Sequence, residues 1–232
     1  MDCGPHSDRA RLHPATSRNP SFELSYWRWA LGVAQLWRER LNLPRDKQWD
    51  DIIARLAPLP VAEGKYVALE SHPDTWDNLD SRHDHPSMLM PLGFLPGGSE
   101  VDRATMTRTL DAVLENWDWE TKIWGWDYPM MAMTAARLGR PDLAVQILLR
   151  DGPNNRYFSS GHCPQGSDEA RPVPLQAGTR RHEIASYMPA NGAFLSAVAL
   201  MIAGWDGCQE RYPGIPKDGT WTIRAEGLRR LP

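Results

Sequence analysis

Apolar and polar positions follow a helical period in every long patterned segment of the chain. Apolar side chains recur three and four residues apart in segments 22–41, 46–56, 102–117, 129–138, 143–149 and 191–203. Proline or glycine separates most of these segments, and Asp46 and Asp102 stand where helix N-caps are expected. The pattern predicts roughly three helix pairs, each with a short link, separated by longer loops.

Two of the expected helices are apolar on more than one side. Segment 22–41 carries one apolar row through Phe22, Tyr26 and Trp29 and a second through Leu24 and Trp27. Segment 191–203 is almost entirely apolar. Such helices are typical of inner layers, so we expect segment 22–41 to be buried on two sides and segment 191–203 to be fully buried.

A short apolar helix, broken by Pro91, is also expected around Ser87 to Leu95, and the other remaining segments lack helical spacing. Tyr66 to Leu69 predicts a short extended piece within loop 61–86, and Trp221 to Arg224 alternates like an edge strand. Segment 151–188 is a second long polar stretch. We therefore predict an all-α fold with minor strands, in which residues 1–18 form a flexible lead and residues 19–232 form one domain.

Composition narrows the possible classes of function. A formal net charge of −3 gives no electrostatic reason to expect a nucleic-acid partner, and no apolar run is long enough for a membrane span. The three cysteines suggest no disulfide framework. Because the N-terminus lacks an apolar signal core, we expect a cytoplasmic protein by default and an extracytoplasmic location only for a longer parent protein.

Tryptophan and ionisable side chains are most concentrated in segment 117–129, which holds four of the 11 tryptophans. Indole rings can hold sugar rings as well as fill cores. Asp127 precedes Pro129 by two residues, which places its carboxylate at an N-cap or in a first helical turn. The segment therefore indicates either an aromatic-walled carboxylate at a helix entrance or a tryptophan-rich turn in which Asp127 only caps the helix.

Several motifs together resemble those of six-hairpin glycosidase-like proteins of bacteria and fungi. They are Asn19-Pro20-Ser21-Phe22-Glu23, Trp124-Gly125-Trp126-Asp127-Tyr128-Pro129-Met130, Ala135-Ala136-Arg137-Leu138-Gly139, Met188-Pro189-Ala190-Asn191-Gly192 and Pro216-Lys217-Asp218-Gly219. The catalytic domain of that family is an (α/α)6 toroid, and residues 19–228 resemble its C-terminal part. The resemblance implies about half of a toroid, whose partner is either the missing N-terminal half or a second copy of the chain.

The resemblance also implies a carbohydrate substrate and hydrolysis of a glycosidic bond by two carboxyl groups. Asp127, Glu23 and Glu70 are the catalytic candidates that this sequence offers. Glu23 could instead complement a helix dipole, because it lies in a first helical turn. The alternative for the whole chain is a non-catalytic module that binds carbohydrate or completes a longer protein.

The candidate substrate-binding residues are Trp124, Trp126, Trp76 and Asn191. Tryptophan in a helix connection can equally serve packing, and Asn191 is expected first as an N-cap. His83-Asp84-His85 has no helix-spaced third ligand, and Cys163 beside His162 does not by itself form a catalytic pair. We therefore expect no metal and no cofactor.

Overall fold

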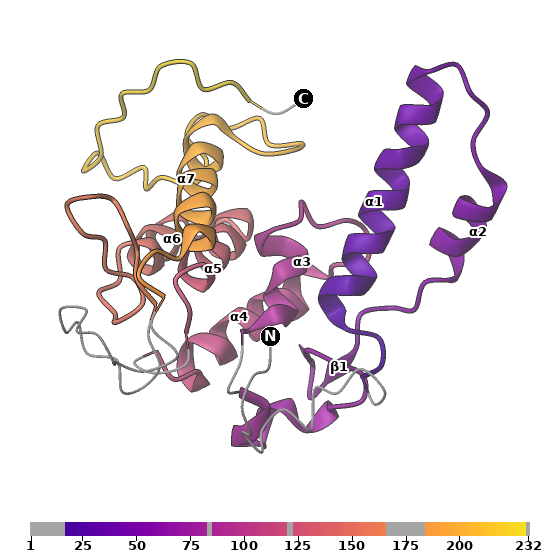
Figure 1. The fold of residues 1–232 in the computed structure, drawn as a ribbon, viewed down its shortest axis with the longest axis horizontal. Coiled ribbons are helices and arrows are strands. Elements are labelled where there is room, and N and C mark those ends of the chain that lie inside the picture. The colour runs from indigo at the N-terminus through magenta and orange to yellow at the C-terminus, as the bar shows by residue number, and fades with distance from the viewer. Residues whose placement is uncertain (1–16, 83–84, 120–122, 166–183, 231–232) are drawn as a thin grey trace.

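The computed structural model describes residues 17–82, 85–119, 123–165 and 184–230, and this part of the chain is mainly helical (Figure 1). The mainly α class is thus confirmed. The elements are α1 (Ser21–Arg40), α2 (Lys47–Arg55), β1 (Val61–Ala62), β2 (Lys65–Tyr66), η2 (Pro73–Trp76), η3 (Leu79–Arg82), η4 (Ser87–Leu89), α3 (Met90–Gly93), α4 (Arg103–Asn116), α5 (Asp127–Arg137), α6 (Pro141–Leu148) and α7 (Met188–Ala203).

The two expected aspartate caps are confirmed. The Asp46 carboxylate accepts the backbone N–H groups of Gln48 and Trp49 at the start of α2. The Asp102 carboxylate accepts the N–H of Thr105 at 2.7 Å at the start of α4. In each case the side chain satisfies backbone donors that have no acceptor within the helix.

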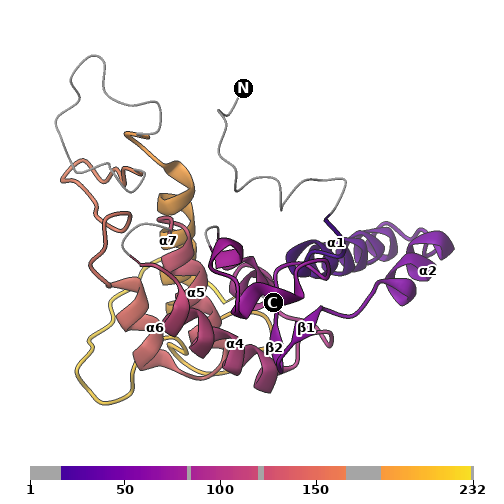
Figure 2. The same ribbon diagram turned by 90° about the horizontal axis from the view of Figure 1, so that it is seen from below.

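Helix α5 lies at the centre of the core. All of its residues are buried, and it packs against α3, α6 and α7, with α4 also in contact (Figures 1 and 2). A Cβ atom at Gly93 would lie 2.6 Å from the carbonyl oxygen of Met130, so only glycine permits α3 to approach this closely.

The burial expected for segment 22–41 is wrong. In α1 the buried residues are Ser21, Leu24, Ser25 and Gln35, whereas Trp27 is 52 % exposed and Trp37 is 55 % exposed. Polar contacts set this orientation. Gln35 hydrogen-bonds both the N–H and the carbonyl of Asp46, and Arg28 donates to the carbonyl of Ile53. These contacts turn the polar side of α1 toward the rest of the chain, so its apolar side faces outward.

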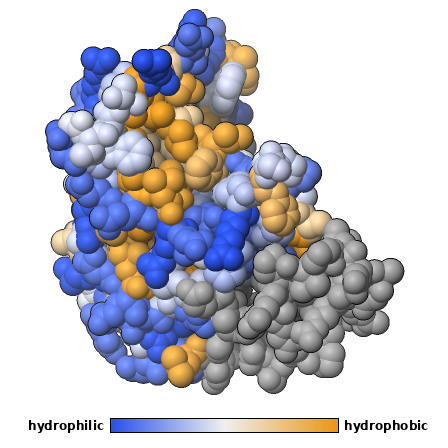
Figure 3. Space-filling view, turned by 90° about the vertical axis from the view of Figure 1, so that its left-hand side faces the viewer, coloured by the Kyte–Doolittle hydropathy of each residue, from blue (hydrophilic) through white to orange (hydrophobic). Residues whose placement is uncertain are grey.

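The full burial expected for segment 191–203 is also wrong. Helix α7 begins at Met188, and its buried residues are Ala190, Ala197 and Met201, while Leu195 is 68 % exposed. A helix that is apolar on all sides cannot bury every side when neighbouring segments cover only one side. Figure 3 views the side of the molecule on which α6 and α7 lie, and hydrophobic residues gather there in patches between polar ones.

Strand content is small and differs in part from expectation. Val61 pairs with Tyr66 and Ala62 with Lys65 in the antiparallel β1–β2 ladder, close to the predicted extended piece. The strand expected at Trp221 to Arg224 is wrong, because this segment is irregular and no neighbouring segment pairs with it in the described residues. Sequence alternation alone does not make a strand where a pairing partner is missing.

Neighbouring helices form the expected type of unit in two places. Helices α1 and α2 contact each other across a short link, and α5 contacts α6 in the same way. Among the described residues, no helix is both long and apolar enough to cross a membrane. Most of the predicted flexible lead, residues 1–16, lies outside the described residues. The backbone carbonyl of Arg18 accepts a hydrogen bond from the backbone N–H of Glu70.

Candidate functional site

Asp127 is the first residue of α5, and its side chain is fully buried. Its carboxylate accepts the backbone N–H of Trp124 at 2.8 Å, and its own N–H donates to the carbonyl of Trp124 at 2.9 Å. This reciprocal pair closes the turn that enters the helix. The predicted place in a first helical turn is confirmed, and the negative carboxylate suits the positive end of the helix dipole.

His85 lies directly against this carboxylate, although 42 positions separate the two residues in the chain. Its Nδ1 is 3.1 Å from Oδ1 and 3.0 Å from Oδ2 of Asp127. The His85 side chain keeps 23 % of its surface exposed, whereas that of Asp127 keeps none. The histidine is therefore the part of this pair that faces solvent.

The indole of Trp126 shares the same histidine nitrogen. Its Nε1 lies 2.8 Å from Nδ1 of His85, and an indole N–H can only donate. Nδ1 therefore either donates a proton to Asp127 or accepts the hydrogen of Trp126. An ionised Asp127 favours the first arrangement, which leaves the lone pair of the histidine on Nε2. This nitrogen can then act as a proton acceptor.

Aromatic rings surround the His85–Asp127 pair. The His85 ring centroid is 4.7 Å from that of Trp126, in an edge-on arrangement, and 5.6 Å from that of Trp124. The ring centroids of Tyr187 and Trp124 are 5.5 Å apart, and those of Phe94 and Trp126 are 5.6 Å apart. Trp124, Trp126 and Tyr187 are each partly exposed, so the histidine sits at the edge of an accessible aromatic cluster.

Buried polar side chains hold the loop that carries the two tryptophans. The Gln165 side-chain oxygen accepts the N–H of Gly125 at 2.6 Å, and the Asn154 amide donates to the carbonyl of Ile123 at 2.9 Å. A Cβ atom at Gly125 would lie 2.7 Å from the carbonyl oxygen of Asn154 and 2.8 Å from Cβ of Ala190. The loop is thus fitted against segments from two other parts of the chain.

The other two candidate carboxylates lie at the entrance of α1. The Glu70 carboxylate accepts a hydrogen bond from the Asn19 side-chain amide at 2.6 Å, and one of its oxygens lies 3.9 Å from Nη2 of Arg18. Glu23 is exposed on the first turn of α1. Segment η4–α3 contacts both α1 and α5, and in the described residues no hydrogen bond or ion pair joins Glu23 or Glu70 to Asp127 or His85. The structure therefore groups Glu23 with Glu70, and Asp127 with His85.

The remaining candidate residues occupy different surroundings. Trp124 and Trp126 belong to the aromatic cluster, whereas Trp76 is 8 % exposed and packs in the core, 6.0 Å from Trp117. Asn191 lies within the first turns of α7, so the expectation that it is an N-cap is wrong. Its amide instead donates to the carbonyl of Gly161 at 2.6 Å, and thereby ties the 154–165 loop to α7.

Sequence reasoning did not assign a role to His85, Tyr187, Gln165 or Asn154. His85 was visible only as the last residue of His83-Asp84-His85, whose first two residues lie outside the described residues. Within the described part of the chain, no three His, Cys, Asp or Glu side chains are grouped so that they could hold a metal ion. Tyr187 directly precedes the Met188–Gly192 motif, which was the available signal for it.

Comparison with known proteins gives no relative. No protein family, curated protein or solved structure shows a significant match to this chain.

Proposed function

We propose that this chain is a carbohydrate-active protein that cleaves a glycosidic bond at the aromatic cluster around His85 and Asp127. The observation that carries the proposal is the buried carboxylate in contact with a part-exposed histidine, bordered by Trp124, Trp126 and Tyr187. Flat aromatic faces suit sugar rings, and the polar pair supplies proton transfer beside them. The resemblance to six-hairpin glycosidases supports the same assignment.

The burial of Asp127 determines how the pair would work. Glycosidic cleavage requires a group that protonates the leaving oxygen and a group that activates water or attacks the sugar. Since Asp127 has no exposed surface, His85 would transfer the proton through Nε2, while the carboxylate holds the ring and stabilises its charged form. Glu23 and Glu70 remain the proposed sources of a second carboxyl group.

A second candidate function follows from the bonds of Asp127. Its carboxylate closes the Trp124–Asp127 turn, which is a structural task that needs no substrate. In that case the aromatic cluster would bind carbohydrate without turnover, or would complete the fold of a longer protein. The exposed apolar sides of α1 and α7 favour a further partner in either case, as a second copy or as the missing half of a toroid.

The test is reducing-sugar release from a panel of glycosides, with calorimetric titration of the same sugars. We expect His85→Asn to lower turnover by about 10²–10⁴-fold, the usual contribution of a positioned acid or base. Asp127→Asn should lower turnover too, because a neutral amide does not stabilise the imidazolium. Glu115→Gln, an exposed change on α4, should have no effect.

The outcomes separate the two candidates. Binding of a sugar without product release would support the non-catalytic function. Equal turnover of the His85→Asn variant and the natural chain would exclude the proposed proton transfer. If no glycoside binds or is cleaved, both carbohydrate functions are excluded, and only the completion of a longer protein remains.

A further inference from the structure

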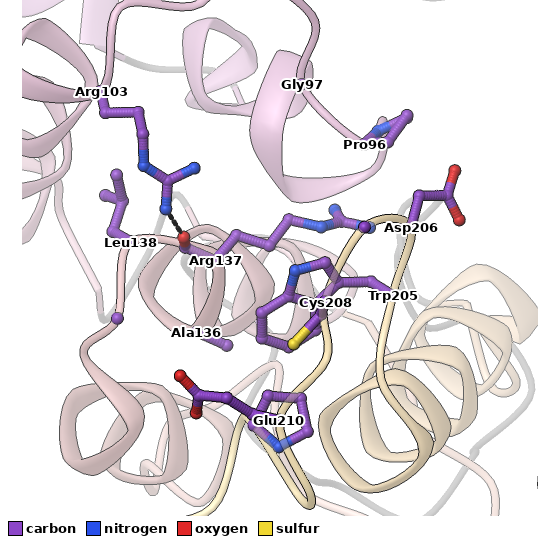
Figure 4. A pocket seen from close by; sticks show the side chains of 13 residues that line it. Pro96, Gly97, Arg103, Ala136, Arg137, Leu138, Trp205, Asp206, Cys208 and Glu210 are labelled. Atoms are coloured by element: carbon purple, nitrogen blue, oxygen red, sulfur yellow. Dashed lines mark hydrogen bonds between the residues drawn. The ribbon is translucent and has the colours of Figure 1, made fainter. Parts of the chain in front are cut away.

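A pocket of about 410 Å³ lies at the far end of α5 from Asp127 (Figure 4). This volume falls in the usual range for small-molecule sites. One wall is formed by the end of α5 with Arg103 at the start of α4, and the other by the segment from Trp205 to Pro213 that follows α7. Helix α5 has 11 residues, so a length of roughly 15 Å separates this pocket from the aromatic cluster.

The two walls carry opposite charges. Arg103 and Arg137 stand on the α4–α5 wall, and Asp206 and Glu210 stand on the wall after α7. Figure 4 shows the Arg137 side chain extending toward Asp206. Within the described part of the chain, none of these four side chains forms an ion pair. The pocket therefore presents separated positive and negative groups that a ligand could join.

Arg137 is the buried member of this set, with 6 % of its surface exposed. Its Nη1 donates to the carbonyls of Leu92, Gly93 and Leu95 at 2.8, 3.0 and 2.8 Å. Its Nε is buried and has no hydrogen-bond partner among the described residues. A buried charged donor without an acceptor is costly, and the pocket that this side chain lines is where an acceptor can be placed.

Arg103 is held beside it. Its Nη2 donates to the backbone carbonyl of Arg137, as Figure 4 shows, and its other donors have no acceptor among the described residues. Burial lowers the pKa of Arg137 to about 10, opposed by the attraction of Asp206, so its guanidinium group is positively charged at neutral pH. Both guanidinium groups line the pocket and have unused N–H donors, which are suited to a carboxylate.

We propose that this pocket binds a small zwitterion, either a free amino acid or a short peptide. Its carboxylate would lie on Arg103 and Arg137, and its ammonium group on Asp206, which stands beside the end of the Arg137 side chain in Figure 4. The two carboxylates would repel a polyanion, and the two guanidinium groups would repel a polyamine. Trp205, which lies with its ring 6.0 Å from the Arg137 guanidinium, supplies apolar surface for the rest of the ligand.

The experiment is calorimetric titration of the full chain with free amino acids and dipeptides at millimolar concentrations. Each ligand that binds is compared with its N-acetylated form, which lacks the ammonium group, and its C-terminal amide, which lacks the carboxylate. We expect each blocked form to bind about 10-fold more weakly or worse, because each loses a charge-assisted hydrogen bond.

Variants locate the site without disturbing the core. Arg103→Gln and Asp206→Asn change exposed side chains, and each should weaken binding of the same zwitterion by about 10-fold or more. The matched control is Arg140→Gln, which changes a nearby arginine that pairs with Asp111 and does not line the pocket. This control should bind like the natural chain.

Three results would overturn the inference. These are failure of every zwitterion in the panel to bind, equal binding of the blocked forms, and equal effects of Arg103→Gln and Arg140→Gln. Binding of neutral sugars that depends on Arg103 and Asp206 would also contradict it, since it would show that the charges serve hydroxyl recognition. None of these results depends on turnover at His85.

Discussion

Helices α5 and α1 share helical periodicity but have opposite relations to the core. All of α5 is buried, whereas in the 20 residues of α1 four are buried and three of these, Ser21, Ser25 and Gln35, are polar. Five large apolar side chains of α1 are exposed, namely Tyr26, Trp27, Trp29, Leu36 and Trp37. An apolar period therefore identifies a helix but does not determine which of its sides faces the protein.

The forces that hold the two helices differ accordingly. Helix α5 is held by close apolar packing, with Met130, Met131 and Tyr128 fully buried. Helix α1 is held at its two ends by hydrogen bonds, from Ser21 to the carbonyl of Val67 and from Gln35 to Asp46. Substitutions in the two helices should therefore have different effects on the free energy of unfolding.

The largest effect is expected from Met131→Ala in α5. Removing this fully buried side chain should lower the free energy of unfolding by about 2–5 kcal/mol, through lost apolar burial and the cavity that remains. Leu36→Ala in α1 removes a side chain that is 53 % exposed, and should change stability by no more than about 0.5 kcal/mol. Urea denaturation measures both, and equal losses would contradict the comparison.

Gln35→Ala should have the next largest effect. Gln35 is fully buried and bonds the N–H of Asp46 at 2.9 Å and its carbonyl at 2.7 Å, so the change leaves two backbone groups without these partners. We expect a loss of about 1–3 kcal/mol. Gln35→Leu keeps most of the volume and should be no better than alanine if hydrogen bonding dominates. A stable leucine variant would instead show that packing holds α1.

The smallest effect on stability, and a clear one on association, is expected from the double change Trp27→Gln with Trp37→Gln. Both rings are more than half exposed, so unfolding by urea should hardly change. If the apolar side of α1 binds a second copy, the variant should associate about 10-fold more weakly by sedimentation velocity. A natural chain that stays monomeric at high concentration would exclude self-association through this face.

Local signals in the sequence were reliable where structure depends on neighbours in the chain. Asp46 and Asp102 mark the starts of α2 and α4 because capping involves the next three residues. The position of Asp127 in the first turn of α5 follows from the same kind of local rule. These features need no knowledge of the tertiary fold.

The rest depends on contacts between distant segments. His85 meets Asp127 across 42 positions, and Gln165 meets Gly125 across 40. No spacing rule reports such pairs, so the sequence suggested Glu23 and Glu70 as the partners of Asp127. The outward orientation of the apolar side of α1 was not predicted for a related reason. It results from the hydrogen bonds of Gln35 to Asp46, just before α2, and of Arg28 to Ile53 within α2.

The position of His85 at the start of a buried segment has a consequence for how the site responds to heat. Pro86 follows it directly, and Met88 and Leu89 have no exposed surface. Only two residues therefore separate His85 from the fully buried core. The backbone of His85 cannot move far from Asp127 unless the segment that contacts α5 also detaches. Loss of the backbone arrangement that positions the pair therefore requires melting of the core, and the temperature at which the site is lost should coincide with the temperature at which the whole domain unfolds.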